Sequence, residues 1–170
     1  NPCPPDVIGI DHYLTSDRYL DHDRERYPAH TWGGNGRDAY ADVEAVRVRD
    51  EPGTSLAGIV TAAARRYGRP VALTEVHIGC SVDEQQRWLD EAWTTCTQLS
   101  AAGVDVRAVT AWALLGSYDW DSLTTCERGH YEPGAFDVSD GTLRRTVLAE
   151  HVAALATGCP LAVARVRPDG

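Results

Sequence analysis

The chain has 170 residues, 43% of them hydrophobic, which is enough apolar material for one domain with a buried core. Its 16 basic and 25 acidic side chains give a net charge of −9, and such a field repels phosphate backbones and anionic membrane surfaces. All 16 basic residues are arginine, so this chain supplies no lysine for a Schiff base, for pyridoxal phosphate or for a phosphate-binding loop. The composition therefore argues against a nucleic-acid partner, a membrane partner and these three kinds of chemistry.

Five cysteines are spread along the chain without a Cys-x-x-Cys pair, which argues against a disulfide framework and a zinc ribbon. No apolar stretch is long enough to span a bilayer, and the prolines at the amino terminus do not resemble a signal sequence. We therefore expect a soluble, cytoplasmic protein. Because the sequence lacks methionine even at position 1, we expect the chain as given to be processed or a fragment.

The first predicted strand is the apolar run at residues 7–10, which ends in the polar string Asp11-His12-Tyr13. Residues 14–53 are polar and broken by glycine and proline, with only residues 43–48 indicating a short extra strand. A structureless connection of this length usually serves function.

A helix is predicted over residues 56–67, with Thr54 or Ser55 as its cap and Gly68 as a left-handed stop. The apolar strand at residues 71–74 follows and carries Glu75 at its carboxyl tip. Ser81 and Glu84 then form a capping box, which opens a second helix that ends at Gly103.

A third strand is predicted over residues 104–115, and a helix over about 143–157 follows a loop rich in glycine, proline and aromatic residues. Apolar strands that alternate with amphipathic helices are typical of an α/β fold with a parallel sheet. Three such units are too few for a closed barrel, because eight strands need on the order of 200 to 250 residues. We therefore predict the carboxyl-terminal portion, about strands 6 to 8, of a TIM (β/α)8 barrel at residues 1–158, with 159–170 as a tail or the start of a linker.

Glu75 is the main candidate for catalysis, because barrel enzymes keep their chemistry at the carboxyl ends of their strands. Retaining glycosidases need two carboxyl groups about 5 to 5.5 Å apart, one of them as nucleophile. Tyr13 could keep Glu75 ionised by a phenolic hydrogen bond, while Trp112 could form a platform under a sugar ring. Asp119 and Trp120 could bind its hydroxyl groups. A solvated or capping glutamate and a packed aromatic rim are the structural alternatives for the same residues.

Three segments resemble glycoside hydrolase family 1, the β-glucosidase family, in the family's order: IGIDHYLTS at 8–16, LTEVHIG at 73–79 and AWALLGSYDW at 111–120. The third is the most specific, because the spacing from Trp112 to Trp120 is kept. The resemblance implies Glu75 as nucleophile, Tyr13 as its hydrogen-bond partner, Trp112 as the platform, and Asp119 and Trp120 as hydroxyl ligands. His12 and His77, at the same two strand ends, are further candidate substrate-binding residues. The resemblance also implies a carbohydrate or glycoside substrate and a mechanism that requires no cofactor.

The sequence departs from the family beside the nucleophile, in the third motif and at the acid/base residue. Val76-His77 replaces the usual Asn-Gly, and Asp119 replaces a glutamate, which puts the sugar preference in doubt. The family's acid/base glutamate lies in an Asn-Glu-Pro sequence on the fourth strand, whereas neither Asn1 nor Asn35 is followed by glutamate. We therefore expect the acid/base residue, and the amino-terminal half of the barrel, to lie upstream, and the isolated chain to be inactive.

Three alternatives remain open from the sequence. The chain also resembles a divergent family 1-like domain that is joined to a dTDP-4-dehydrorhamnose reductase-like domain. It could bind a sugar or nucleotide-sugar without hydrolysing it, as part of a larger sugar-metabolism protein. A metal-dependent barrel hydrolase is the least favoured, with Asp11, His12, Glu75 and His77 as mixed ligands.

Overall fold

The computed structural model describes residues 3–50, 55–120, 122 and 126–158, which form two compact units. The first unit comprises the described residues up to His12 and from Leu56 onward, and the second comprises those from Tyr13 to Ser55. The predicted tail at 159–170 and the candidate cap Thr54 lie outside the described residues. Among the residues that are described, no helix is long and apolar enough to cross a lipid bilayer.

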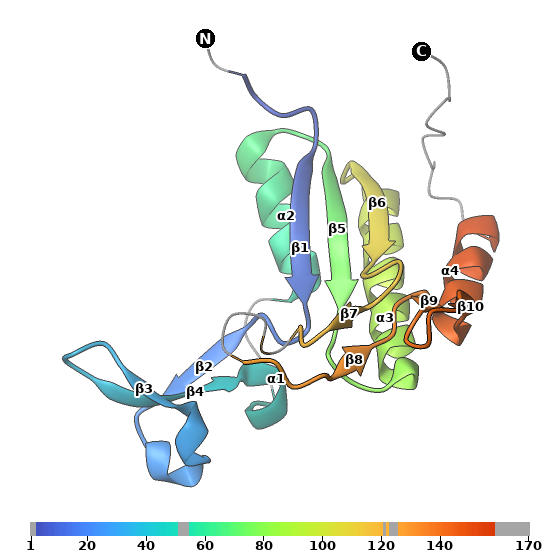
Figure 1. The fold of residues 1–170 in the computed structure, drawn as a ribbon. Helices are drawn as coiled ribbons and strands as arrows, with labels where there is room; N and C mark the ends of the chain where they lie inside the picture. Colours follow the sequence, from blue (N-terminus) through green and yellow to red (C-terminus); the bar gives the residue numbers. More distant parts are fainter. Residues whose placement is uncertain (1–2, 51–54, 121, 123–125, 159–170) are drawn as a thin grey trace. The chain divides into compact units, whose positions relative to one another are not determined.

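The first unit is built on a sheet of three strands in the order β1-β5-β6, comprising β1 (Ile8–Tyr13), β5 (Val71–His77) and β6 (Val106–Ala111). The strands run in the same direction (Figure 1), and β5 pairs with β6 in parallel register. At the start of β1, the N–H of Ile8 donates to the carbonyl of Pro70 over 2.8 Å. The α/β class predicted from the sequence is therefore observed.

Helices α2 (Leu56–Tyr67), α3 (Val82–Ala101) and α4 (Val147–Gly158) belong to the same unit. The side chains of Val60, Leu73 and Cys96 are fully buried where α2, β5 and α3 meet. Burying an aliphatic side chain such as Val60 or Leu73 stabilises the fold by about 1.5–3 kcal/mol. Burial raises the pKa of the Cys96 thiol to about 11, which keeps it protonated.

The predicted helix signals are confirmed at both ends of this core. Gly68 follows α2 with φ +59°, the left-handed conformation that glycine adopts without strain. Ser81 precedes α3, and the Glu84 carboxylate accepts its N–H over 3.2 Å and its hydroxyl over 2.8 Å. These hydrogen bonds, led by the one from the hydroxyl, lower the pKa of Glu84.

One face of the sheet is exposed and lined by small or polar side chains. Thr74 donates its hydroxyl hydrogen to the Asp11 carboxylate over 2.7 Å, and a Cβ at Gly9 would come within 3.1 Å of the Thr74 methyl group. Ala108 and Thr110 of β6 are exposed as well. Parallel sheets are normally covered on both faces, so this face is unusual for a complete α/β domain.

Two predicted elements begin or end elsewhere than expected. The strand predicted over 104–115 stops at Ala111, because the carbonyls of Ala113 and Leu114 accept hydrogen bonds from Ala135 and Phe136 instead of continuing the ladder with β5. The helix predicted from about 143 begins at Val147, because residues 144–145 form a short strand.

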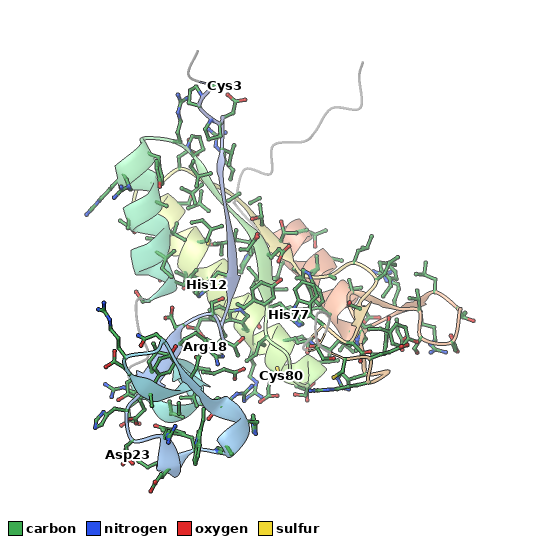
Figure 2. All side chains as sticks on the ribbon, turned by 60° about the vertical axis from the view of Figure 1, so that its left-hand side comes forward. Cys3, His12, Arg18, Asp23, His77 and Cys80 are labelled. Atoms are coloured by element: carbon green, nitrogen blue, oxygen red, sulfur yellow. The ribbon has the colours of Figure 1, made fainter. Side chains whose placement is uncertain are left out.

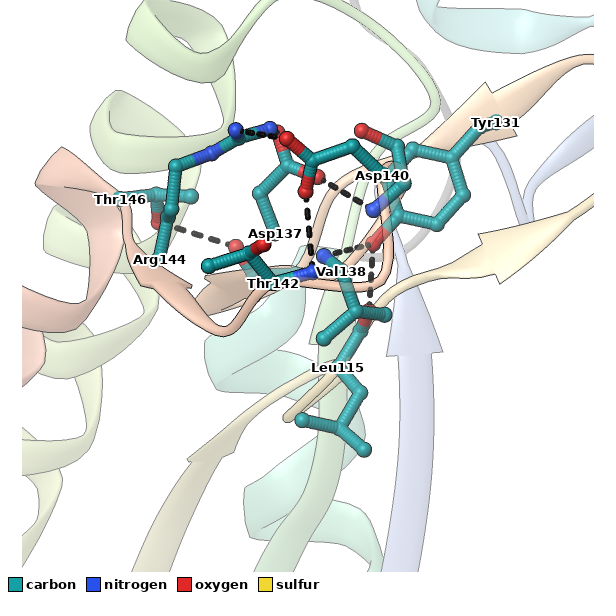
Figure 3. Close-up of polar contacts among 10 residues, drawn as sticks. Leu115, Tyr131, Asp137, Val138, Asp140, Thr142, Arg144 and Thr146 are labelled. Carbon is teal, nitrogen blue, oxygen red and sulfur yellow. Dashed lines mark hydrogen bonds and ion pairs between the residues drawn. The ribbon is translucent and has the colours of Figure 1, made fainter.

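The segment between β6 and α4 folds into two short antiparallel pairs. Strand β7 (Ser117–Tyr118) pairs with β8 (Tyr131–Glu132), and β9 (Phe136–Asp137) pairs with β10 (Arg144–Arg145). The Tyr131 hydroxyl donates to the Leu115 carbonyl over 2.7 Å and accepts the Val138 N–H over 3.0 Å (Figure 3). The described part of this segment therefore has its own network of hydrogen bonds.

The second unit is an antiparallel sheet in the order β2-β4-β3, comprising β2 (Arg18–Asp21), β3 (Trp32–Gly34) and β4 (Ala39–Glu44). Two 3-10 turns, η1 (Arg24–Arg26) and η2 (Ala29–Thr31), lie between β2 and β3. The expectation of a structureless connection is wrong for this segment. The strand expected at 43–48 is also wrong in its bounds, since Ala45–Val48 forms the short helix α1, whose first N–H is accepted by the Asp17 carbonyl.

A buried carboxylate organises the turn that follows β2 in the second unit. Asp21 is 4% exposed, and it accepts the N–H of Asp23 over 2.9 Å and the hydroxyl of Tyr27 over 2.8 Å. These two hydrogen bonds, the backbone one first, lower the pKa of Asp21. The polar sequence of this unit is thus compatible with a small ordered structure.

Candidate functional site

Glu75 lies inside strand β5, because the strand continues through Val76 and His77 instead of ending at the glutamate. Glu75 is half-buried, between the exposed Thr74 and the buried Val76. The predicted position near the carboxyl end of a parallel strand is observed, and the structure adds two residues beyond it. Its assignment as a nucleophile stays a prediction.

An aromatic cluster lies at the carboxyl ends of β5 and β6. The His77 imidazole lies 4.5 Å from the Trp112 ring, and Trp112 lies 4.9 Å from the Trp120 ring, measured between ring centroids. His77 ends β5 (Figure 2), and Trp112 is the first residue after β6. Trp120 is 41% exposed, so the cluster has an accessible end. Three of the residues selected from the sequence are therefore brought together.

Glu132 is a residue of this cluster that sequence reasoning missed. Its Oε1 lies 3.1 Å from Nε2 of His77, and the side chains of His77 and Glu132 are only 2% and 13% exposed. The sequence feature that points to Glu132 is its place in a glycine- and aromatic-rich loop after a predicted strand, since such loops carry function in barrel enzymes. Nothing in the spacing from residue 77 to residue 132 marks this particular pairing.

Asp119 is 7% exposed and binds the backbone of its own loop. Its carboxylate accepts the N–H groups of Arg128, Gly129 and His130 over 2.9, 3.0 and 2.7 Å. These backbone hydrogen bonds, led by that from Gly129, hold the pKa of Asp119 below its ordinary value. The observed contacts position the loop beside Trp120, and the hydroxyl-ligand role predicted for Asp119 stays a prediction.

His12 and Tyr13 end strand β1. The His12 ring is buried and lies 5.6 Å from the Trp88 ring of α3, measured between centroids (Figure 2 labels His12). Tyr13 is half-buried, and its backbone N–H donates to the Ser16 hydroxyl over 3.1 Å. The roles expected for both residues in substrate binding and in orienting Glu75 stay predictions.

The metal-site alternative gains no support from the geometry. In the described part of the chain, no three histidine, cysteine, aspartate or glutamate side chains are grouped so that they could hold a metal ion. Asp11, one of the four expected ligands, instead accepts the Thr74 hydroxyl.

An apolar hollow of about 200 Å³ lies against β6, and Leu89, Trp93, Val109, Val152 and Leu155 are among its lining residues. None of the predicted site residues lines it. The hollow is therefore separate from the aromatic cluster around Trp112.

Comparison with solved structures relates this fold to β-glycosidases. The β-glycosidase from Pyrococcus horikoshii matches with a TM-score of 0.58 at 20% identity, over 88% of this chain and 34% of that one. The β-glucosidase from Thermotoga maritima in complex with castanospermine matches with a TM-score of 0.58 at 17% identity, over 89% and 34%. The β-glycosidase from Thermosphaera aggregans matches with a TM-score of 0.50 at 19% identity, over 60% and 21%.

A scan against protein-family models and a search of curated proteins gave no match. The chain spans about a third of the length of the first two matching structures, and the identities are too low to carry more than the fold. The described residues therefore have an α/β fold that resembles part of a β-glycosidase.

Proposed function

We propose that this chain is the carboxyl-terminal part, about strands 6 to 8, of a retaining β-glucosidase-like glycoside hydrolase of the family 1 kind. The observation that carries the proposal is the position of Glu75 near the carboxyl end of β5, on a fold that matches about a third of the length of two solved β-glycosidases. The aromatic cluster at the ends of the neighbouring strands supports it, since indole rings stack on the apolar faces of sugars.

In this proposal Glu75 attacks the anomeric carbon while the glycosidic C–O bond breaks, and an acid upstream of this chain protonates the leaving oxygen. Water then hydrolyses the glycosyl ester and restores the Glu75 carboxylate. Tyr13 would orient Glu75, Trp112 would form the platform, and Trp120 would donate its indole N–H to a hydroxyl group. The mechanism uses no metal and no organic cofactor.

The exposed face of the sheet supports the fragment assignment. Gly9, Asp11, Thr74, Ala108 and Thr110 are exposed, whereas the interior of a closed barrel is filled by side chains from all of its strands. We propose that further (β/α) units cover this face and close the barrel. The isolated chain would then lack the acid/base residue and would be inactive.

Replacing Glu75 with glutamine in the protein that contains the remaining barrel units tests the catalytic role. Hydrolysis of an aryl β-glucoside should fall by orders of magnitude, because the carboxamide cannot form the glycosyl ester. Glu91→Gln, an exposed position on α3, is the matched control and should leave turnover unchanged. Unchanged turnover in Glu75→Gln would exclude Glu75 as the nucleophile.

A second candidate function is sugar binding without hydrolysis, favoured by the absence of an Asn-Glu sequence from this chain. Deoxynojirimycin, an iminosugar found in one Thermotoga maritima β-glucosidase structure, is a suitable probe because its amine carries positive charge where a glycosyl cation would develop. Under either function, Glu75→Gln should weaken its binding to the chain. If the longer protein binds the probe but does not hydrolyse the aryl β-glucoside, the binding function is favoured.

A further inference from the structure

The contact between Glu132 and His77 connects the loop after β6 to the end of β5. The Glu132 carboxylate lies 3.1 Å from the His77 Nε2. Both side chains are largely removed from water, and a carboxylate in such a place needs hydrogen-bond donors to offset its lost hydration. An imidazole N–H that donates to a carboxylate is held in one tautomer and one ring orientation.

The orientation of His77 has a direct consequence for Trp112. The two ring centroids are 4.5 Å apart at an interplanar angle of 46°, and Trp112 continues the contact to Trp120 at 4.9 Å and 43°. Aromatic pairs at such distances are stabilised beyond the area they bury and have preferred geometries. A change in the plane of His77 therefore changes the packing of Trp112 and, through it, of Trp120.

The Glu132 backbone is itself fixed, which makes it a suitable anchor. Glu132 pairs with Ser117 in the β7–β8 ladder, and the neighbouring Tyr131 is held through its hydroxyl (Figure 3). A Cβ at Gly116 would lie 2.3 Å from the Glu132 carbonyl oxygen, so the two backbones are in close contact. The backbone that carries this carboxylate is thus held by contacts on two sides, from Ser117 and from Gly116.

We infer that Glu132 is a positioning residue of the candidate sugar site, which holds His77 against Trp112 and so sets the orientation of the Trp112 platform and of Trp120. Its relevance to sugar binding rests on the proposed function. The arrangement of the side chains does not, because it follows from the contacts of Glu132, His77, Trp112 and Trp120 alone.

The test is the indole N–H region of the ¹⁵N NMR spectrum of the 170-residue chain, with the two signals assigned by Trp112→Phe and Trp120→Phe. Glu132→Met keeps the length and volume of the side chain but removes the acceptor, so both signals should shift or broaden. Glu132→Gln retains an acceptor oxygen and should restore positions near those of the wild type. Glu127→Ala, an exposed glutamate of the same loop, should change neither signal.

A double-mutant cycle separates positioning through His77 from a general loosening of the loop. In a His77→Gln background, Glu132→Met should add little further change, because the intermediate ring is already absent. The inference is overturned if Glu132→Met leaves both indole signals in place, if its effect is the same without His77, or if both Glu132 variants lose their fold by circular dichroism.

The same variants titrated with the iminosugar probe distinguish failure of this inference from failure of the proposed function. Glu132→Met should raise the Kd of the probe about three- to tenfold, the range expected for a disturbed aromatic contact. If the wild-type chain does not bind the probe while Glu132→Met still shifts both indole signals, the positioning of the two indoles stands and the sugar site proposed for this chain is overturned. Probe binding that is equal in the wild type and in Glu132→Met would overturn the inference while leaving the proposed function intact.

Discussion

Asp119 illustrates how one side chain fixes the backbone beside the candidate site. Three consecutive N–H groups, those of Arg128, Gly129 and His130, point at its two carboxylate oxygens. Asp119 itself has φ +52°, a left-handed conformation that aspartate and asparagine tolerate better than most residues. Aspartate therefore suits this position for two reasons: it tolerates the left-handed backbone, and its carboxylate accepts the N–H groups of the loop.

Asp119→Asn should lower the Tm of the chain at pH 7, because asparagine keeps the shape and the backbone tolerance but loses the charge and one acceptor oxygen. The native pKa of Asp119 lies below its ordinary value of 3.8, so the carboxylate stabilises the fold above that pH. The contribution is lost as the pH falls through the lower native pKa. The Tm difference between wild type and Asp119→Asn, measured by calorimetry, should therefore be full at pH 7 and shrink below about pH 4.

A difference in Tm that stays constant down to pH 2 would contradict this assignment. Asp83→Asn is a suitable control, since Asp83 is an exposed carboxylate at the start of α3. Asp83 lies in the first helical turn, so any effect there should be small.

At the scale of elements, the backbones of Gly116 and Gly134 are in close contact in the loop between β6 and α4. A Cβ at Gly134 would lie 2.2 Å from the Ala113 carbonyl oxygen and 2.6 Å from the Gly116 nitrogen. The Thr146 hydroxyl lies 2.9 Å from the Gly134 carbonyl and fixes the same turn from the side of α4. The approach is therefore backbone against backbone, which a rotamer change cannot relieve.

Gly134→Ala should destabilise the first unit by about 1–3 kcal/mol, the usual cost of overpacking a site that must shift to accept new atoms. Urea denaturation measures the change. Gly158→Ala at the end of α4 is the matched control, because a Cβ there would meet no atom within 4 Å and alanine favours the helix by up to about 1 kcal/mol. Equal stability of both variants would mean that the loop relaxes at no cost.

How much could be predicted from the sequence differs between local and non-local features. Helix α2, the capping box at Ser81 and the left-handed Gly68 follow from periodicity and from backbone preferences, which act within a few residues. Glu132 could not be assigned to His77, because their contact is made across 55 residues by the folding of a loop. The end of β6 was missed for the same reason, since the hydrogen bonds that replace its ladder come from residues 135 and 136.

The second unit shows the opposite error, in which ordered structure was missed in a polar segment. Its strands β3 and β4 have few fully buried side chains, and Ala41 and Val43 are the main apolar ones. Part of its order comes instead from a buried Asp21 with two hydrogen-bond donors. Apolar periodicity is a weak signal where hydrogen bonds of this kind replace a larger core.

At the scale of the whole molecule, the chain has two compact units that each pair their own strands. The first has a helix-covered core around Leu73, and the second has a smaller core around Ala41. A smaller unit buries a smaller fraction of its surface and is less stable. Separate cores allow each unit to open without the other.

Hydrogen exchange should therefore show two levels of protection, with β5 exchanging more slowly than β4. Val60→Ala should speed exchange in β5 and α2, and Val43→Ala should speed it in β2 and β4, because each removes buried methyl groups from one core only. Mass spectrometry of peptic peptides resolves the two units. A single common opening rate, changed equally by either substitution, would show that they unfold together.

The pairing of β1 with β5 also has a kinetic consequence. Ile8 donates to Pro70, so the first strand waits for a partner that is synthesised about sixty residues later, whereas β2 and β4 pair across a much shorter span. Contacts between distant residues form slowly, since the intervening chain must first be closed into a loop. During synthesis on the ribosome, the antiparallel sheet can therefore form before β1 pairs with β5, so the folding of the two units is separated in time.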